Sequence, residues 1–207
     1  MAAVIVETLT VGLYETNCYI YASRQGREAF VIDPGEDGAA ILDRANQLDL
    51  KITKILLTHG HIDHTGGLRD LKTATGAEIG IHSEDAGILQ DTMLSAMLGI
   101  SKSLPPDPDF LFEDGQHITM AGLTLTVLHT PGHTRGSVSL LGDGLIFTGD
   151  TLFRQGIGRT DLPGGSYTDL MKSIKNRLLT LPEEIRAYPG HGPATTIGDE
   201  KLFNPWL

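Results

Sequence analysis

The stretch of sequence that decides the fold is Thr58-His59-Gly60-His61-Ile62-Asp63-His64-Thr65-Gly66-Gly67, which directly follows a mainly apolar run at residues 52–57. Three imidazoles and one carboxylate within six residues are not the side chains of a packed core. Imidazole nitrogen and carboxylate oxygen are ligands for zinc, iron and manganese. A strand followed by a turn lets His59 and His61 point to one position, and it leaves Asp63 and His64 free to face a neighbouring one. This segment therefore predicts ligands for two metal ions.

The composition predicts one domain over residues 1–207, since the chain is long enough to bury a sizeable core. A hydrophobic content of 40% and a charged content of 20% are typical of a soluble globular protein. The formal net charge of −10 argues against nucleic acid or an anionic membrane as a partner, because both attract clustered Lys and Arg. No apolar run approaches the ~20 residues of a membrane span. The N-terminus lacks the pattern of a signal peptide, and the single Cys18 excludes an internal disulfide, so a cytoplasmic protein is expected. No oligomeric state is predicted.

The order of expected elements suits two packed sheets with helices outside, in the α/β (α+β) class. β-Branched and apolar patterns predict strands at residues 4–9, 17–22, 28–33, 52–57, 78–81, 116–120, 123–128, 137–141, 145–148 and 185–188. Helical spacing of apolar residues predicts helices at residues 39–48, 68–75, 84–98 and 167–179, with a last turn at 199–203. Residues 103–108 are a loop by composition, and we do not expect a domain boundary there because candidate ligands lie on both sides.

Three turns in the second half of the chain each place a ligand-type residue beside glycine. They are Pro131-Gly132-His133, Gly149-Asp150 and Gly190-His191, and each follows an expected strand. Glycine permits the backbone geometry that brings such side chains to the edge of a sheet, where strand ends converge. We therefore expect one site with seven ligands: His59, His61, Asp63, His64, His133, Asp150 and His191.

Seven ligands are too many for one tetrahedral zinc and suit two metal ions that share a carboxylate. The expected allocation is His59, His61 and His133 to one ion, Asp63, His64 and His191 to the other, and Asp150 as the bridge. Asp63 is also expected to act in catalysis by orienting a metal-bound hydroxide. The predicted cofactors are two divalent ions, with zinc first and iron or manganese as alternatives.

His59-Gly60-His61-Ile62-Asp63-His64, followed in order by His133, Asp150 and His191, resembles the signature of the metallo-β-lactamase superfamily. The resemblance covers nearly the whole chain, because Val31-Ile32-Asp33-Pro34-Gly35 also fits an element of that superfamily. It implies a four-layer αββα sandwich with the site at one edge of the sheets. It also implies the same allocation of ligands to two metals.

Within the superfamily, Thr148-Gly149-Asp150-Thr151-Leu152-Phe153 with Gly156-Ile157-Gly158-Arg159 resembles the glyoxalase II (hydroxyacylglutathione hydrolase) group. That resemblance implies hydrolysis of small-molecule thioesters such as S-lactoylglutathione. Residues 190–198 through Asn204-Pro205 are similar to a short, single-domain bacterial branch. Full-length glyoxalase II has a C-terminal helical domain that helps to bind glutathione, whereas this sequence ends at Leu207. Arg159 stands where the family has a basic residue that contacts glutathione, but Asp161 replaces a nearby family Tyr.

The expected chemistry is attack on the thioester carbonyl by a hydroxide that two dications stabilise near neutral pH. A metal would stabilise the developing oxyanion, and the thiolate leaves readily. Arg159 is expected to pair with a substrate carboxylate or, as the alternative, with Asp161.

Other functions remain open from the sequence. Persulfide dioxygenases share the implied fold and resemble this chain at Gly158-Arg159-Thr160-Asp161. They use a single iron, which in this sequence would be held by His59, His133 and Asp150. A lactonase or esterase would use the same two metals on uncharged substrates. A non-enzymatic binding module would need the hydroxide position to be blocked.

Several other residues are expected to have structural or supporting roles. Asp33 is expected to make a turn or to orient a ligand, and His129 to support a ligand or pack. For the rest we expect surface or core positions for His82 and His117, buried packing for Cys18, and a core or pocket-lining role for Met93 and Met97.

Overall fold

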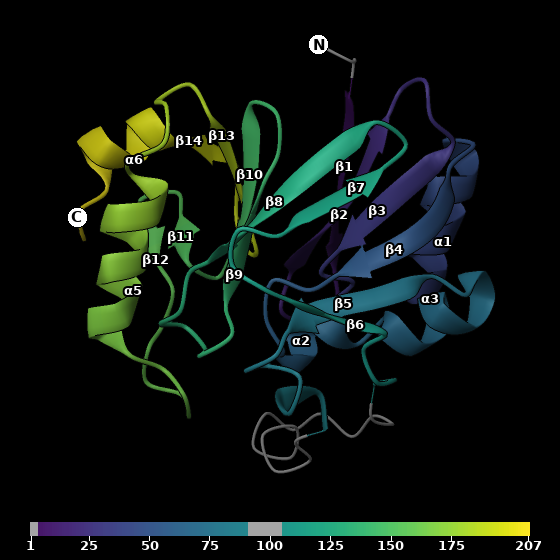
Figure 1. The fold of residues 1–207 in the computed structure, drawn as a ribbon, viewed down its shortest axis with the longest axis horizontal. Coiled ribbons are helices and arrows are strands. Elements are labelled where there is room, and N and C mark those ends of the chain that lie inside the picture. Colours follow the sequence, from purple (N-terminus) through teal and green to yellow (C-terminus); the bar gives the residue numbers. More distant parts are fainter. Residues whose placement is uncertain (1–3, 91–104) are drawn as a thin grey trace.

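The computed structural model describes residues 4–90 and 105–207, and it contains two six-stranded sheets packed face to face (Figure 1). The first sheet has the order β1 (Val4–Val11), β2 (Thr16–Ser23), β3 (Glu28–Ile32), β4 (Lys51–Leu56), β5 (Glu78–His82) and β6 (Phe110–Phe112). The pairs from β1 to β3 are antiparallel and those from β3 to β6 are parallel. Parallel neighbours need crossover connections. The helices α1 (Gly38–Gln47) and α3 (Leu68–Thr75) supply two of them and cover the outer face.

The second sheet has the order β14 (Thr195–Thr196), β13 (Arg186–Pro189), β10 (Leu145–Gly149), β9 (Val138–Leu141), β8 (Leu123–His129) and β7 (His117–Met120). Only β10 and β13 are parallel in it. Its outer face packs against α5 (Tyr167–Ser173), the π-helical turn η2 (Ile174–Leu178) and α6 (Ile197–Phe203). The hairpin of β11 (Leu152–Phe153) and β12 (Gly156–Ile157) lies beside them in Figure 1.

Strand β2 shows how the sequence produces four layers. Tyr19 and Tyr21 point between the two sheets, whereas Cys18 and Ile20 point toward the helices, because successive side chains of a strand alternate. Between the sheets, the ring of Tyr21 lies 5.6 Å from that of Phe147 in the second sheet. Buried side chains thus fill three interfaces, and the predicted αββα sandwich is confirmed.

The structure differs from the expected elements mainly in short segments. The strands β6, β11, β12 and β14 were not predicted, because two or three residues are too few to show a periodic pattern. The helix expected at residues 84–98 is wrong in its described part, which contains only the 3₁₀ turn η1 (Ile88–Gln90). The remainder, with Met93 and Met97, lies outside the described residues. In the two described ranges no helix is long and apolar enough to cross a membrane.

Candidate metal centre

All seven predicted ligands come just after the carboxyl ends of strands. His59 and His61 follow β4, and Asp63 and His64 belong to the four-residue helix α2 (Ile62–Thr65). His133, Asp150 and His191 follow β8, β10 and β13 in the other sheet. The two sheets meet here. The Val138 N–H donates to the Thr58 carbonyl at 2.8 Å, and the backbones of Thr16 and His191 pair in an isolated antiparallel β-bridge.

His59, His61 and His133 form one group, in which the three ligand atoms lie within 4.8 Å of one another. The closest pair is Nδ1 of His61 and Nε2 of His133, at 2.9 Å. Three nitrogens at ~2.0–2.1 Å from one tetrahedral ion would be about 3.3 Å apart. This group therefore has the separations that one ion needs.

Asp63, His64 and His191 form a second group within the same limit. Nε2 of His191 lies 3.3 Å from Oδ2 of Asp63 and 3.3 Å from Nε2 of His64. Asp150 stands between the groups: its Oδ1 is 3.4 Å from Nε2 of His64, and its Oδ2 is 3.6 Å from Nε2 of both His133 and His191. The structure thus brings all seven candidate residues together, in two groups with Asp150 between them.

The outer nitrogens of the imidazoles are held by acceptors. Nδ1 of His133 lies 2.8 Å from the Arg159 carbonyl, and Nδ1 of His191 lies 3.1 Å from the Tyr14 carbonyl. A carbonyl can only accept, so Nδ1 carries a proton in both rings, and in the neutral imidazole Nε2 keeps its lone pair toward the centre. Such outer hydrogen bonds fix the ring orientation and tautomer of metal-binding histidines.

Asp33 holds ligands of both groups. It is buried, with φ at 50°, and it accepts the Thr58 N–H at 2.7 Å and the Thr58 hydroxyl at 2.6 Å. It also accepts Nδ1 of His64 at 3.1 Å. Because the Thr58 hydroxyl donates to Asp33, its oxygen accepts from Nδ1 of His59 at 3.1 Å. Asp33, His59 and His64 are also close enough to group around a metal. Since these hydrogen bonds occupy the outer nitrogens of both histidines, we interpret Asp33 as an orienting residue.

Burial and neighbouring charges shift the pKa values of the candidate ligands. Burial, together with the neighbouring imidazoles, holds the pKa of His59 well below its usual range and lowers that of His61 to about 4. Burial alone would raise the pKa of Asp150, but His64 and other imidazoles lower it. Burial would lower the pKa of His64, but the carboxylates of Asp150, Asp63 and Asp33 raise it, and the pKa of His191 is raised as well. Metals bind neutral imidazole and ionised carboxylate, so a metal at His64 and His191 would displace their protons.

Two unpartnered atoms show that these residues fit metal ions. Nε2 of His59 and Oδ1 of Asp150 are buried and have no hydrogen-bond partner among the described residues, a state that few buried polar atoms show. The backbone also leaves space for the cluster, because a Cβ on Gly190 would lie 2.1 Å from Oδ1 of Asp150 and 2.6 Å from Cε1 of His64. The donor set, its inward lone pairs and these atoms together suit a two-metal centre.

A pocket of about 400 Å³ opens on the centre. Much of its remaining wall is formed by Tyr14, Phe153, Ile157 and Leu162. Arg159 also lines it, but Nε and Nη2 of its guanidinium donate to the two oxygens of Asp161 at 2.8 and 2.7 Å. The sequence left Arg159 with two roles, and the structure shows the pair with Asp161 beside the pocket.

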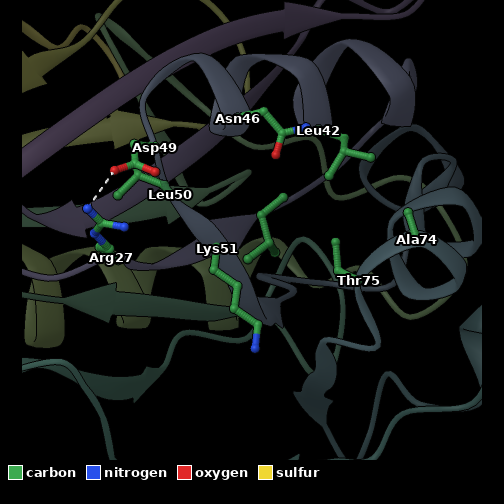
Figure 2. Close-up of a pocket in the computed structure, with 9 residues that line it drawn as sticks. Arg27, Leu42, Asn46, Asp49, Leu50, Lys51, Ala74 and Thr75 are labelled. Carbon is green, nitrogen blue, oxygen red and sulfur yellow. Dashed lines mark ion pairs between the residues drawn. The ribbon is translucent and has the colours of Figure 1, made fainter.

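A second hollow, of about 480 Å³, lies at the opposite end of β4 (Figure 2). Figure 2 shows Arg27 and Asp49 joined as an ion pair among the residues that line the hollow, which also include Lys51. Nη2 of Arg27 and Oδ2 of Asp49 are 3.3 Å apart. Lys51 begins β4, whereas His59 follows its other end. None of the seven predicted ligands lines this hollow, so it is separate from the candidate centre.

The other histidines and Cys18 lie outside the centre. The rings of His82 and His129 stack at 4.2 Å and 12°, and Glu84 lies close enough to form a further possible ligand group with them. A metal must lie in the plane of each imidazole that binds it, and two nearly parallel rings at this separation share no such position. His117 is exposed and bonds to Thr126. Cys18 is buried, as predicted, and burial raises the pKa of its thiol.

Sequence reasoning missed the groups that orient the ligands. Thr58 is adjacent to the motif, and a hydroxyl beside a candidate ligand was the one available signal. The carbonyls of Tyr14 and Arg159 had none, because any residue carries a carbonyl and only the folded chain brings these two to His191 and His133.

Residues 11–191 match the family model of the metallo-β-lactamase superfamily, and the chain belongs to that superfamily. It is 37% identical to hydroxyacylglutathione hydrolase GloC of Haemophilus influenzae, over 98% of this chain and 97% of the relative. Among solved structures, BLEG-1 B3 metallo-beta-lactamase superposes with a TM-score of 0.93 at 36% identity, covering 98% of this chain and 99% of that one. TTHA1623 in a di-iron-bound form superposes with a TM-score of 0.89 at 36% identity, covering 98% and 100%.

These similarities confirm the predicted family and fold. The superfamily consists mostly of hydrolases and binds divalent metals, which agrees with the histidine groups described above.

Proposed function

We propose that this chain is a two-metal hydrolase of thioesters, with S-acylglutathione as the first substrate class. The observation that carries the proposal is the convergence of seven donors in two groups around Asp150, with unpartnered atoms on Asp150 and His59. The proposed ligands are His59, His61, Asp63, His64, His133, Asp150 and His191. Zinc is the first choice of metal. Iron is the alternative that the di-iron form of TTHA1623 supports, and manganese accepts the same donors.

The residues around the pocket have separate proposed tasks. The bound ions would supply a water of lowered pKa and polarise the substrate carbonyl. Asp63, whose side chain is 17% exposed, would accept a hydrogen bond from that water and so orient it. Imidazole charges overcome the effect of burial and lower the pKa of Asp63, which keeps it an acceptor. We also propose that residues 1–207 act as one domain, because both sheets supply donors to the same centre.

Glutathione recognition is assigned to Arg159, because its guanidinium lines the pocket and can take a carboxylate on two donors. The relative named hydroxyacylglutathione hydrolase supports this substrate class. A substrate carboxylate would compete with Asp161, and the exposed pair offers little resistance because solvent screens such pairs and leaves them weak.

A lactonase or esterase is the second candidate, and a specific observation favours it. The pairing of Arg159 with Asp161 neutralises the cation that lines the pocket, and four apolar side chains make up much of the remaining wall. Such a pocket also suits an uncharged acyl group.

The test combines metal analysis with three substrates: S-lactoylglutathione, the same acyl group on N-acetylcysteamine, and a simple lactone. The proposal expects two metals per chain and fastest turnover of the glutathione thioester. It expects Arg159→Ala to raise the KM for that substrate alone. Preference for the lactone, with Arg159→Ala silent, would move the assignment to the second candidate. One iron per chain with oxygen uptake would make the protein an oxygenase instead.

A further inference from the structure

Asp85 is a fully buried carboxylate outside the ligand set, and it accepts three hydrogen bonds. Its Oδ2 accepts the Gly60 N–H at 2.9 Å and the Thr134 hydroxyl at 2.7 Å. Its Oδ1 accepts the Gly136 N–H at 2.7 Å. A buried carboxylate persists in a fold when donors such as these compensate for the loss of water.

The three donors belong to the two loops that carry the first ligand group. Gly60 lies between His59 and His61 in the loop after β4 of the first sheet. Thr134 follows His133 directly, in the loop after β8 of the second sheet. One side chain therefore connects the two sheets at the place where three of the histidines must converge.

The loops pack closely against Asp85 as well. A Cβ on Gly136 would lie 2.7 Å from Oδ1 of Asp85 and 2.8 Å from its Cβ. A Cβ on Gly60 would lie 2.9 Å from the Asp85 carbonyl. Both loops are thus fitted to the side chain and the backbone at this position, and a shift of Asp85 would move both.

We propose that Asp85 is a positioning residue for the metal held by His59, His61 and His133. This inference rests on the proposed ligand role of those histidines. A carboxylate suits the position because it only accepts, and its two oxygens have capacity for all three donors. In an Asp85→Asn variant the side-chain NH2 would replace one of the two oxygens. It would then face the N–H of either Gly60 or Gly136, so that two donors oppose each other. The second group does not depend on Asp85, because His64 bonds to Asp33 and His191 to the Tyr14 carbonyl.

The test measures zinc affinity in proteins that keep one ligand group, by competition with a chelator and without any substrate. His191→Ala leaves the first group intact, and His61→Ala leaves the second. Asp85→Asn is added to each. Loss of residues that orient ligands typically weakens metal binding 10–100-fold. We expect that loss in the His191→Ala background and less than a threefold change in the His61→Ala background.

Glu200→Gln is the matched control. Glu200 is as buried as Asp85 and accepts Thr195 Oγ1, Asn204 Nδ2 and the Gln155 N–H at 2.5, 2.8 and 2.8 Å, none of which lies in the loops around His59 or His133. It should leave zinc affinity unchanged in both backgrounds.

Equal losses in both backgrounds, or none in either, would overturn the proposal. If Asp85→Asn does not fold, Thr134→Val removes one of the three hydrogen bonds to the same carboxylate, together with the contact between the Thr134 and Ser137 hydroxyls. It should still weaken zinc binding severalfold in the His191→Ala background only, and no selective loss there would refute the role of Asp85. Because the readout is metal affinity, failure of the thioesterase assignment would leave this result unaffected.

Discussion

Replacing Thr58 with valine tests whether Asp33 orients His59 through the Thr58 hydroxyl. Valine keeps the shape of threonine and removes only the hydroxyl, which donates to Asp33 at 2.6 Å and accepts from His59 at 3.1 Å. The backbone bond from Thr58 N to Asp33, at 2.7 Å, is retained. Nδ1 of His59 would then lose its acceptor. The ring could shift its proton to Nε2, which faces the proposed metal and cannot bind it when protonated.

The magnitudes follow from the buried position of Thr58, which is 1% exposed. Leaving a buried donor without a partner costs ~1–3 kcal/mol. For a chain of this length that lowers the melting temperature of the metal-free protein by roughly 2–12 °C. Zinc affinity at the first group should fall ~10–100-fold, because outer partners of metal-binding histidines have effects of that size. That loss corresponds to about 1.4–2.7 kcal/mol.

The assay pairs thermal unfolding of the metal-free protein with chelator competition for zinc. Thr195→Val is the control, because Thr195 also donates its hydroxyl to a buried carboxylate, Glu200, at 2.5 Å. It should lower the melting temperature and leave both zinc affinities unchanged. If Thr58→Val loses stability like the control but binds zinc at the first group within threefold of the unmodified protein, then the Thr58 hydroxyl does not orient His59.

Three further predictions concern the centre and its surroundings. Gly190→Ala should lose at least one metal on metal analysis while remaining folded by circular dichroism, because the new Cβ would overlap Oδ1 of Asp150 and Cε1 of His64; two metals per chain in this variant would contradict the described packing. Cys18 should react with iodoacetamide at pH 8 at least ~10-fold more slowly in the native than in the urea-unfolded protein, since burial and then the Asp33 charge raise its pKa and the thiolate is the reactive form; equal rates would contradict its burial. The protein at a free metal concentration of ~100 times Kd should have a melting temperature roughly 5–11 °C above that of the protein stripped by a chelator. An unchanged melting curve would mean that no metal stabilises the folded state.

Much of the centre could be predicted from the sequence because its donors are rare residue types in a local pattern. His59, His61, Asp63 and His64 are close in the chain, and each of the other three stands beside glycine after an apolar strand. Side-chain alternation in a strand and the convergence of strand ends are local rules, so they apply before the tertiary structure is known. The same rules predicted the sheets and most of the helices.

The helix expected at residues 84–98 shows where local rules stop. The stretch has apolar residues at helical spacing, yet residues 83–87 form turns, and Asp85 accepts hydrogen bonds from Gly60, Thr134 and Gly136. A carboxylate that bonds to distant segments overrides a periodic pattern, because burying it without those donors would cost more than a helical turn stabilises.

The sequence by itself indicated the family and the four layers through its resemblance to the superfamily, and it predicted the seven candidate donors from residue type and spacing. Only the tertiary structure decided how the donors are oriented. Asp33 reaches His64 directly and His59 through Thr58, and the carbonyls of Tyr14 and Arg159 hold His191 and His133. The physical reason is that an outer hydrogen bond joins residues far apart in the chain through groups with no sequence signature. The pairing of Arg159 with Asp161 is likewise a contact that the sequence offered as one of two alternatives.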